Sequence, residues 1–591
     1  MRDRPWLSPL LLVGAGVAAY ADSFHGPFFF DDLESIPGNP TIRHLWPPWV
    51  PLLPPVHRTV AGRPLVNLSL AVNYALGGLH VEGYHALNLV LHLANGLLLW
   101  ALVRRTLAQP RLRAEVGEAG PWLATAIALL WLVHPLATES VTYVIQRCEL
   151  LMAFFLLLTL YGVARGWTVL AIVACALGMA SKEVMVVTPL LALAYDRIFV
   201  FRRGWALHVG LAETWFVLAG LVAATPHPNT GFGFEGLGPA RYAATQLGVI
   251  VHYLRLALWP HPLVVDYFDW PLARTAGDVA VPAAVLAILG VATLWALARY
   301  PAWGFLGLWF FLILAPTSSF LPSRAEIAAE RRMYLPLAAV VALVVLGAHA
   351  GIARLRRVPA RPRQTAEIVV LIVVAAVLAY GTNARNVDYR SVVAIWSDVL
   401  AKRPENARAH INLGSFLSQQ GDTAGATSHF TAALRIAPDN AAAHYNLGFL
   451  LASQGKLHEA VGHYTRSLIS NPGDPKVHHG MGVALARLGQ TKAAIDEYRV
   501  ALRLNPADGE AHNNLGNLLS DAGRSEEAVT EWAEAVRVNP DLPEPHYNLG
   551  TALAEQGRTA EALAHLEAAV RLKPGFEPFR ETLEELRKSA R

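Results

Sequence analysis

Cysteine is nearly absent from this 591-residue sequence. The two cysteines, Cys148 and Cys175, lie within or beside apolar runs, which excludes a disulfide framework and a cysteine zinc site. Charge is also scarce, because 16% of the residues are charged, against roughly 25% in soluble domains. There is no dinucleotide-binding fingerprint and no P-loop, which argues against a nucleotide as energy source or donor. The small net charge of +4 indicates membrane topology rather than nucleic-acid binding.

Long apolar runs make up most of the first two thirds of the chain. Hydrophobic residues account for 54% of the sequence, the mean hydropathy is +0.34, and the runs stop near residue 382. We expect an all-α protein with a transmembrane domain over 1–383 and a second domain over 384–591. Runs of about 17–25 apolar residues predict spanning helices. About eleven are expected, near 5–21, 84–103, 121–137, 147–165, 167–182, 184–200, 205–224, 279–298, 301–317, 332–351 and 366–382.

Arginine-rich loops predict the orientation of these spans. Such loops stay in the cytoplasm, and three of them agree if the N-terminus is inside and the segment 240–259 forms an interfacial or re-entrant helix rather than a span. The part after the last span is then extracytoplasmic. The loops contain Arg104, Arg105, Arg111 and Arg113; Arg197, Arg202 and Arg203; and Arg354, Arg356, Arg357, Arg361 and Arg363. The first run ends in Ala19-Tyr20-Ala21, so signal-peptide cleavage is an alternative that the ten later runs argue against.

Polar exceptions gather on the predicted external face. Asp31 and Asp32 follow three phenylalanines, a pattern that suits a general base at the membrane surface, with a helix N-cap or a solvated turn as the alternative. Ionisable groups at membrane depth usually face a polar cavity, although Lys182–Glu183 and Glu330–Arg331 also suit simple helix ends. The other exceptions are Arg63, His134, Glu139, Arg147, Glu149, Arg332 and Tyr334.

Six short motifs occur in order along the apolar part. They are Phe30-Asp31-Asp32, Arg63-Pro64-Leu65, Tyr84-His85-Ala86-Leu87-Asn88, His134-Pro135 with Thr138-Glu139 and Val141, Ser181-Lys182-Glu183, and Ala329-Glu330-Arg331-Arg332 with Tyr334-Leu335-Pro336. Together with the repeats described below, this set resembles the TMTC-type protein O-mannosyltransferases and their bacterial relatives. These are multispanning GT-C glycosyltransferases fused to tetratricopeptide repeats. The segment 225–278 matches least.

The resemblance implies a polyprenyl-phosphate-sugar donor and transfer of a hexose, mannose or another, on the periplasmic or lumenal side. Asp31 or Asp32 would deprotonate the acceptor hydroxyl, and which of them does so stays open. Arg331, Arg332 and Lys182 would hold the donor phosphate, because guanidinium groups stabilise the charge of a departing phosphate. Sugar-binding or supporting roles fall to Arg63, His134, Glu139, Arg147, Glu183, Glu330 and Tyr334. No metal ligand is assigned, and a need for a divalent metal stays open.

The second part repeats with a period of 34 residues. Six prolines keep this spacing without drift, and glycine, alanine and one large residue repeat in the same register, as in tetratricopeptide repeats. The prolines are Pro404, Pro438, Pro472, Pro506, Pro540 and Pro574. We expect a half repeat over 391–406 with Trp396 in the large position, five repeats over 407–574 and a capping helix over 575–589.

Two columns of polar residues follow the repeats. His410, His444, His478, His512 and His546 occupy a position that packs between helices, so a structural role is expected, without bound zinc, because successive repeats lie too far apart to share one ion. Asparagines two residues later suit either an acceptor-peptide groove or hydrogen bonds between repeats. They are Asn412, Asn446, Asn514 and Asn548.

The leading hypothesis is therefore a membrane glycosyltransferase of a bacterial inner membrane or an equivalent endoplasmic-reticulum membrane. Its acceptors would be Ser or Thr hydroxyls of extracytoplasmic proteins, bound by the repeats. The alternatives are a catalytically inactive, membrane-anchored repeat scaffold and a transferase of the same fold that acts on lipid or glycan acceptors. The intact acidic pair and Arg331-Arg332 favour an enzyme.

Overall fold

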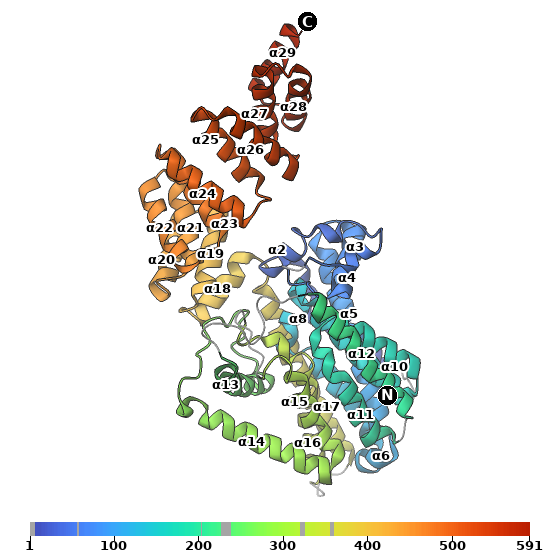
Figure 1. The fold of residues 1–591 in the computed structure, drawn as a ribbon. Helices are drawn as coiled ribbons and strands as arrows, with labels where there is room; N and C mark the ends of the chain where they lie inside the picture. The colour runs from blue at the N-terminus through green and yellow to red at the C-terminus, as the bar shows by residue number, and fades with distance from the viewer. Residues whose placement is uncertain are drawn as a thin grey trace. The chain divides into compact units, whose positions relative to one another are not determined.

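The computed structural model describes residues 6–55, 58–201, 204–225, 238–319, 326–354 and 360–590, with the side chains of 360–363 left aside. The chain divides into two compact units, Met1–Pro404 and Glu405–Arg591, called here the membrane unit and the repeat unit. Every regular element of the described residues is helical, as the sequence predicts (Figure 1).

The membrane unit begins with α1 Leu7–Ala19, η1 Ala21–His25, α2 Asp31–Ser35, η2 Pro40–Ile42, α3 Trp49–Leu52, α4 Pro64–Gly77, α5 Val81–Leu107, α6 Pro110–Val116, η3 Gly117–Ala119 and α7 Gly120–Leu132. It continues with η4 Pro135–Ala137, α8 Thr138–Thr142, η5 Val144–Gln146, α9 Arg147–Arg165, α10 Thr168–Met179, η6 Glu183–Val187, α11 Thr188–Tyr195 and η7 Asp196–Val200. The last elements are α12 Trp205–Ala224, α13 Pro239–Leu258, α14 Ala276–Arg299, α15 Pro301–Leu314, η8 Glu330–Met333, α16 Pro336–Ala353, α17 Ala360–Val387 and α18 Val392–Lys402.

Six helices of the described residues are long and apolar enough to cross a membrane. They are α5, Val144–Arg165, α12, α14, α16 and the Gln364–Val387 part of α17. A seventh crossing is possible only if Pro110–Leu132 and Pro135–Thr142, bent by 55°, form one span. The protein is thus an integral membrane protein. The predicted count of about eleven is not confirmed, because α1, α10 and α15 have only 13, 12 and 14 residues, fewer than the ~20 of a straight span.

Only some of the arginines that predict the orientation lie among the described residues. Arg202, Arg203, Arg356 and Arg357 lie outside the described residues, as do the side chains of Arg361 and Arg363. The segment 240–259 forms α13, a 20-residue helix that is not among the helices apolar enough to cross. The side of the membrane on which the repeats lie therefore stays a prediction.

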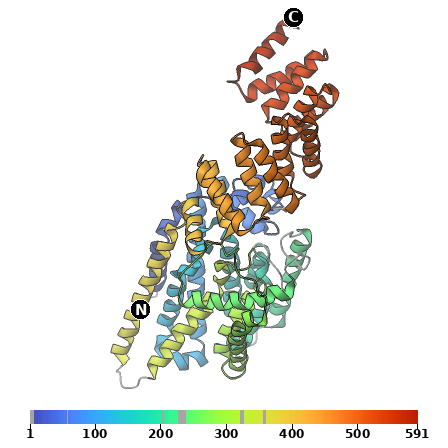
Figure 2. The ribbon, with the colours of Figure 1, turned by 90° about the vertical axis from the view of Figure 1, so that its left-hand side faces the viewer.

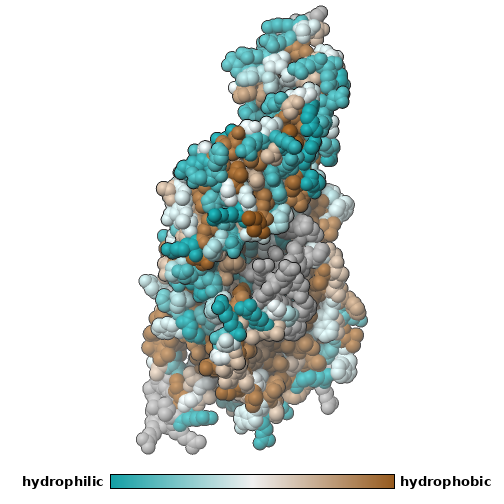
Figure 3. Space-filling model, turned by 60° about the vertical axis from the view of Figure 1, so that its left-hand side comes forward, coloured by the Kyte–Doolittle hydropathy of each residue, from teal (hydrophilic) through white to brown (hydrophobic). Residues whose placement is uncertain are grey.

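The core of the membrane unit is built around α5, which packs against α7 and α9, while α9 also packs against α10. The blue to blue-green helices of this unit lie side by side in both views (Figures 1 and 2). Small and large apolar side chains fill this core, with Leu123, Trp131 and Leu156 at most 1% exposed. The surface differs between the units. Hydrophobic residues are exposed over the membrane unit, and the repeat unit is mostly hydrophilic (Figure 3). Such an apolar surface is stable when lipid covers it.

The repeat unit consists of α19 Ala407–Gln419, α20 Thr423–Ile436, α21 Ala441–Ser453, α22 Leu457–Ser470, α23 Pro475–Arg487, α24 Thr491–Leu504, α25 Gly509–Asp521, α26 Ser525–Val538, α27 Pro543–Glu555, α28 Thr559–Leu572 and α29 Glu577–Ser589. Consecutive helices pack in pairs, one pair for each predicted repeat, and α29 caps the last pair.

The repeating glycine and the repeating large residue explain this pairing. A Cβ atom on Gly414 would lie 2.8 Å from the ring of Phe430, and one on Gly516 would lie 2.6 Å from the ring of Trp532. Real Cβ atoms do not approach so closely, so the first helix needs glycine where the large side chain of the second helix crosses it. The repeat consensus is therefore a packing rule between two helices.

The helix expected as half a repeat is α18. The Ser391 hydroxyl caps its first turn by accepting from the backbone N–H of Ala394 at 3.1 Å. Trp396 is buried, and the helix belongs to the membrane unit.

Candidate active site

The acidic pair begins the short helix α2, and its two members have different surroundings. Asp32 is fully buried, and its carboxylate accepts from the backbone N–H of Ile145 at 2.8 Å and of Phe29 at 3.3 Å. Burial raises the pKa of Asp32 well above the usual carboxyl range, although both amides oppose this shift. Asp31 is half-buried. Asp32 thus fastens the loop to the start of α9, whereas Asp31 lies at its surface.

Phe30 places Asp31 by means of an unusual backbone. Its φ angle is 49°, in the region that favours glycine, at a cost of about 1–3 kcal/mol. Its ring packs edge-on against Trp396 of α18, with ring centroids 5.8 Å apart. Tyr143 fixes the other side, because its hydroxyl accepts from the backbone N–H of Asp31 at 3.0 Å and its ring stacks on Phe29. Sequence reasoning missed the role of Tyr143, which no motif signals.

A small cavity lies among residues of α9, η6, α15, η8 and the start of α16. Lys182, Arg332 and the carboxylate of Glu149 line it, together with Ile313, Thr317, Leu335 and Pro336. Lys182 and Glu149 form a buried ion pair. The Arg332 guanidinium donates to the backbone carbonyls of Ile327 at 3.1 Å and Glu326 at 2.7 Å, which hold it without neutralising it. The cavity therefore combines two cations with one carboxylate.

Arg331 is neutralised, unlike its neighbour. Its guanidinium donates to the Glu139 carboxylate at 2.5 Å and forms an ion pair with Glu326, and its backbone N–H donates to the other Glu139 oxygen at 2.9 Å. These two carboxylates raise the pKa of Arg331 despite its burial. An arginine with two carboxylate partners is a weaker candidate for a phosphate ligand than Arg332.

The remaining motif residues converge on the same region. Arg63 makes a two-pronged pair with Glu183, with N–O distances of 3.1 and 3.2 Å. The Tyr143 hydroxyl accepts from the backbone of Asp31, the Tyr143 N–H donates to the Glu139 carbonyl, and the Glu139 carboxylate pairs with Arg331. Arg332, the next residue, lines the same cavity as Lys182. Charged residues from widely separated stretches of the sequence thus form one cluster.

Four other predicted site residues hold the scaffold around this cluster. Each makes contacts that join distant segments, which fits a supporting role. Arg147 is fully buried and donates to Asn88 Oδ1 at 2.8 Å, the Tyr84 carbonyl at 3.0 Å and the Ser69 carbonyl at 3.2 Å. Tyr334 donates its hydroxyl to His92 Nδ1 at 2.7 Å, and His134 donates to the Ala257 carbonyl at 3.2 Å. Glu330 accepts from the backbone N–H of Val264 at 2.5 Å and the hydroxyl of Tyr267 at 2.6 Å.

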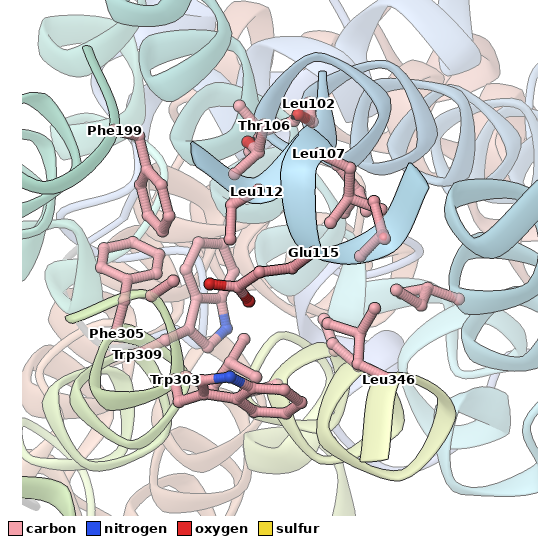
Figure 4. A pocket seen from close by; sticks show the side chains of 18 of the residues that line it. Leu102, Thr106, Leu107, Leu112, Glu115, Phe199, Trp303, Phe305, Trp309 and Leu346 are labelled. Atoms are coloured by element: carbon pink, nitrogen blue, oxygen red, sulfur yellow. Dashed lines mark hydrogen bonds between the residues drawn. The ribbon is translucent and has the colours of Figure 1, made fainter. Parts of the chain in front are cut away.

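An apolar cavity continues along α15 and α16. Its walls include Leu102, Phe305, Trp309, Ala338 and Leu346, and Glu115 of α6 projects into it (Figure 4). Trp309 lies one helical turn from Ile313, which lines the cavity of Lys182 and Arg332. The same helix pair thus borders a charged cavity and, next to it, an apolar one.

The asparagines of the repeat unit mostly make hydrogen bonds to the preceding repeat. Asn446 donates to Ser415 Oγ at 3.2 Å, and Asn548 donates to Asn513 and Asn517 at 3.0 and 2.9 Å. Asn514 lies 3.4 Å from His479 Nε2. Asn412 Nδ2 is buried without a partner among the described residues. Of the two interpretations of this column, the geometry favours contacts between repeats, and peptide binding stays a hypothesis.

The histidine column forms pairs within each repeat. Every first-helix histidine meets a residue 19 positions later through Nδ1, at 2.9–3.0 Å for His410–His429, His444–His463 and His546–His565, and at 2.6 Å for His478–Glu497 and His512–Glu531. His444, His478, His512 and His546 also donate from Nε2 to the proline carbonyl before their helix. Within the described ranges no group of three or more His, Cys, Asp or Glu is placed to hold a metal.

Comparisons with known proteins cover both units. The Mus musculus and Homo sapiens proteins called protein O-mannosyl-transferase TMTC4 are each 26% identical to this chain, over alignments that cover 72% of it and 66% of the relative. The resemblance to the TMTC-type family is confirmed. The chain spans just under two thirds of the length of these relatives.

Residues 388–441, 417–484, 484–523 and 513–575 match tetratricopeptide-repeat families. The first match begins at residue 388, just before α18. The solved structure of the tetratricopeptide-repeat protein YrrB aligns with 32% of this chain and 97% of its own, at 23% identity and a TM-score of 0.28.

Proposed function

We propose that this protein is a membrane glycosyltransferase. It would transfer mannose or another hexose from a polyprenyl-phosphate-sugar donor to Ser or Thr hydroxyls of extracytoplasmic proteins. The observation that carries the proposal is the charged cluster, in which contacts link Asp31 through Tyr143 and Glu139 to Arg331, next to the cavity of Arg332 and Lys182. The names of the TMTC-type relatives support a sugar transferase with a protein acceptor.

In this proposal Asp31 is the general base and Asp32 a positioning residue. Both oxygens of Asp32 are occupied by backbone amides, so its carboxylate is committed to the loop. The Asp31 carboxylate would take the proton of the acceptor hydroxyl while that oxygen attacks the anomeric carbon. The bond from the anomeric carbon to the phosphate oxygen breaks, and the electron pair leaves with the polyprenyl phosphate. This displacement inverts the configuration at the anomeric carbon.

The departing phosphate needs positive charge close to it. Lys182 and Arg332 line one cavity and would stabilise the growing charge, because fixed cations in a site with little water act strongly on it. Arg331 would act indirectly, since Glu139 and Glu326 already pair with it. The apolar cavity one turn further along α15 and α16 suits the first isoprene units of the donor (Figure 4).

The repeats would bind the acceptor protein, as the sequence suggests. The predicted extracytoplasmic position of residues 384–591 is part of this proposal. An inactive scaffold would not need the buried cations beside an acidic pair, so the cluster favours an enzyme. A lipid or glycan acceptor is an outcome that the experiment below can reveal.

The test is transfer of radiolabelled mannose from polyprenyl-phosphate mannose in membranes that contain the full chain. We expect Asp31→Asn to lower the rate by at least about a hundredfold, as loss of a general base does. Lys182→Met and Arg332→Lys should lower the rate while protein levels are maintained. Glu34→Gln is the matched control, because Glu34 is an exposed acid in the same helix. Wild-type transfer by Asp31→Asn would contradict the assignment, and label found only in lipid would shift the acceptor class.

A further inference from the structure

Four arginines surround one hollow at the end of the membrane unit where α5 and α9 finish. Arg104 and Arg105 come from the last turn of α5, Arg113 from α6 and Arg165 from the last turn of α9. Trp100 and Tyr161 provide aromatic walls, and Glu118 is the one carboxylate among the lining residues. Helix α6 lies far from α2 within this unit (Figure 1). This arginine pocket is therefore separate from the candidate active site.

The charge of the arginine pocket is not neutralised within the described part of the chain. No carboxylate there lies within ion-pair distance of any of the four guanidinium groups. Arg105 donates from Nε to the Ala164 carbonyl at 2.9 Å, which ties the two helix ends together. Arg104 stacks on Trp100 at 4.8 Å from the ring centroid, and Arg165 stacks on Trp167 at the same distance. These contacts orient the arginines and leave the pocket positive.

Cations at helix ends also have simpler uses, because they complement the helix dipole and favour the cytoplasmic side. Neither of these uses requires the arginines to line the same pocket. Arg111, two residues before Arg113 on α6, points elsewhere and stacks on Phe201. Four arginines from three separate elements instead line one pocket, with apolar and aromatic groups along part of its wall. Such an arrangement suits a phosphate-bearing ligand with an apolar part.

The position of the pocket indicates the source of the phosphate. Both α5 and α9 have the length and hydropathy of membrane spans, and both end at the pocket, so it lies at the boundary between lipid and water. Tryptophan and tyrosine are enriched at this level, and basic pockets there bind anionic headgroups. We propose that the arginine pocket binds the headgroup phosphate of an anionic phospholipid. A zwitterionic headgroup would add a further cation beside four guanidinium groups.

The test uses the full chain, purified and delipidated in a neutral detergent. Dioleoylphosphatidylglycerol is titrated and its binding followed by native mass spectrometry, with dioleoylphosphatidylcholine as the zwitterionic comparison. We expect preferential binding of the anionic lipid, weakened about fivefold by either Arg104→Gln or Arg113→Gln, the effect of losing about one basic contact near a membrane surface. Arg111→Gln is the matched control and should leave binding unchanged. Both pocket arginines are exposed, so their variants should keep the wild-type melting temperature in detergent.

Three results would overturn the proposal. The first is equal binding of the two lipids. The second is an equal loss of binding in Arg111→Gln and Arg113→Gln, which would indicate diffuse surface charge. The third is displacement of the lipid by millimolar inorganic phosphate, which would point to a soluble anion as the ligand.

Discussion

Buried polar side chains find their partners at very different sequence distances in the two units. In the membrane unit, Arg331 donates to Glu139, 192 residues earlier, and Arg147 donates to Asn88, 59 residues earlier. In the repeat unit, each first-helix histidine meets a residue 19 positions later, and Asn548 donates to Asn517, 31 positions earlier. The membrane unit thus depends on single contacts between remote segments, whereas the repeat unit uses the same local contact several times.

This difference has consequences for stability. The contacts of Arg147 occur once and join α9 to α5 and α4, so nothing replaces them when the arginine is removed. In a solenoid each repeat contacts only its neighbours, so the loss of one contact is felt locally. Substitutions of comparable chemistry should therefore have larger effects in the membrane unit.

The largest effect is expected from Arg147→Met. The substitution removes the three hydrogen bonds that the buried guanidinium donates to Asn88 Oδ1 and to the Tyr84 and Ser69 carbonyls, at a cost of about 3 kcal/mol or more. Arg499→Met is the comparison in the repeat unit, where the Arg499–Glu527 pair is largely exposed and contributes about 0–1 kcal/mol. Thermal unfolding of the detergent-solubilised protein measures both. Equal shifts of the melting temperature would remove the proposed contrast between the units.

A pH-dependent effect of similar or smaller size is expected at Glu330. Burial raises its pKa to about 7, above the value in an unfolded chain. The native state therefore binds the proton of Glu330 more tightly than the unfolded chain does. The stability gained from this protonation is lost as the pH rises from about 4.5 through 7. Glu330→Gln resembles the protonated form and should be more stable than wild type at pH 8, by up to about 3 kcal/mol.

At pH 4 to 5 the Glu330→Gln variant and the wild type should unfold at similar temperatures. Glu34→Gln, which replaces an exposed acid near the acidic pair, is the control for the same change of side chain at the surface. A constant difference between Glu330→Gln and wild type across this pH range would mean that Glu330 does not titrate as its burial implies.

A smaller effect is expected in the asparagine column. Asn548→Ala removes two hydrogen bonds to the preceding repeat, at a cost of about 1–2 kcal/mol. Asn412→Ala is the matched control, because the Asn412 amide nitrogen is buried without a partner among the described residues. Thermal unfolding of both variants should show the larger loss for Asn548→Ala. The reverse order would favour a role of the column outside repeat contacts.

The two units also differ in how much of their structure the sequence predicts. In the repeat unit the 34-residue period reflects one recurring contact, such as that between Gly414 and the ring of Phe430. In the membrane unit, hydropathy located the apolar segments but not the number of crossings, since α10 and α15 are too short to decide by length. The motifs identified Asp31 and Asp32 as a pair, yet only the structure separates them. The contact of Asp32 with the Ile145 amide, 113 residues away, leaves no trace in local spacing.

The smallest effect is expected at the histidine pairs, where the chain contains its own comparison. Burial and the neighbouring His444 lower the pKa of His463. The stability that neutral His463 contributes to the fold is therefore complete above about pH 6.5 and is lost as the pH falls. Burial lowers the pKa of His512 too, but the hydrogen bond to Glu531 outweighs this effect and raises the pKa, so the His512–Glu531 pair loses stability as the pH rises.

His463→Glu gives the second repeat the pairing of the third and fourth. It should make α21 and α22 roughly two- to fivefold more protected from amide exchange at pH 5, relative to wild type, and no more protected at pH 7.5. The reciprocal Glu497→His should reverse the sign in α23 and α24. Exchange that responds equally to pH in both variants would show that these pairs pack without sharing a proton.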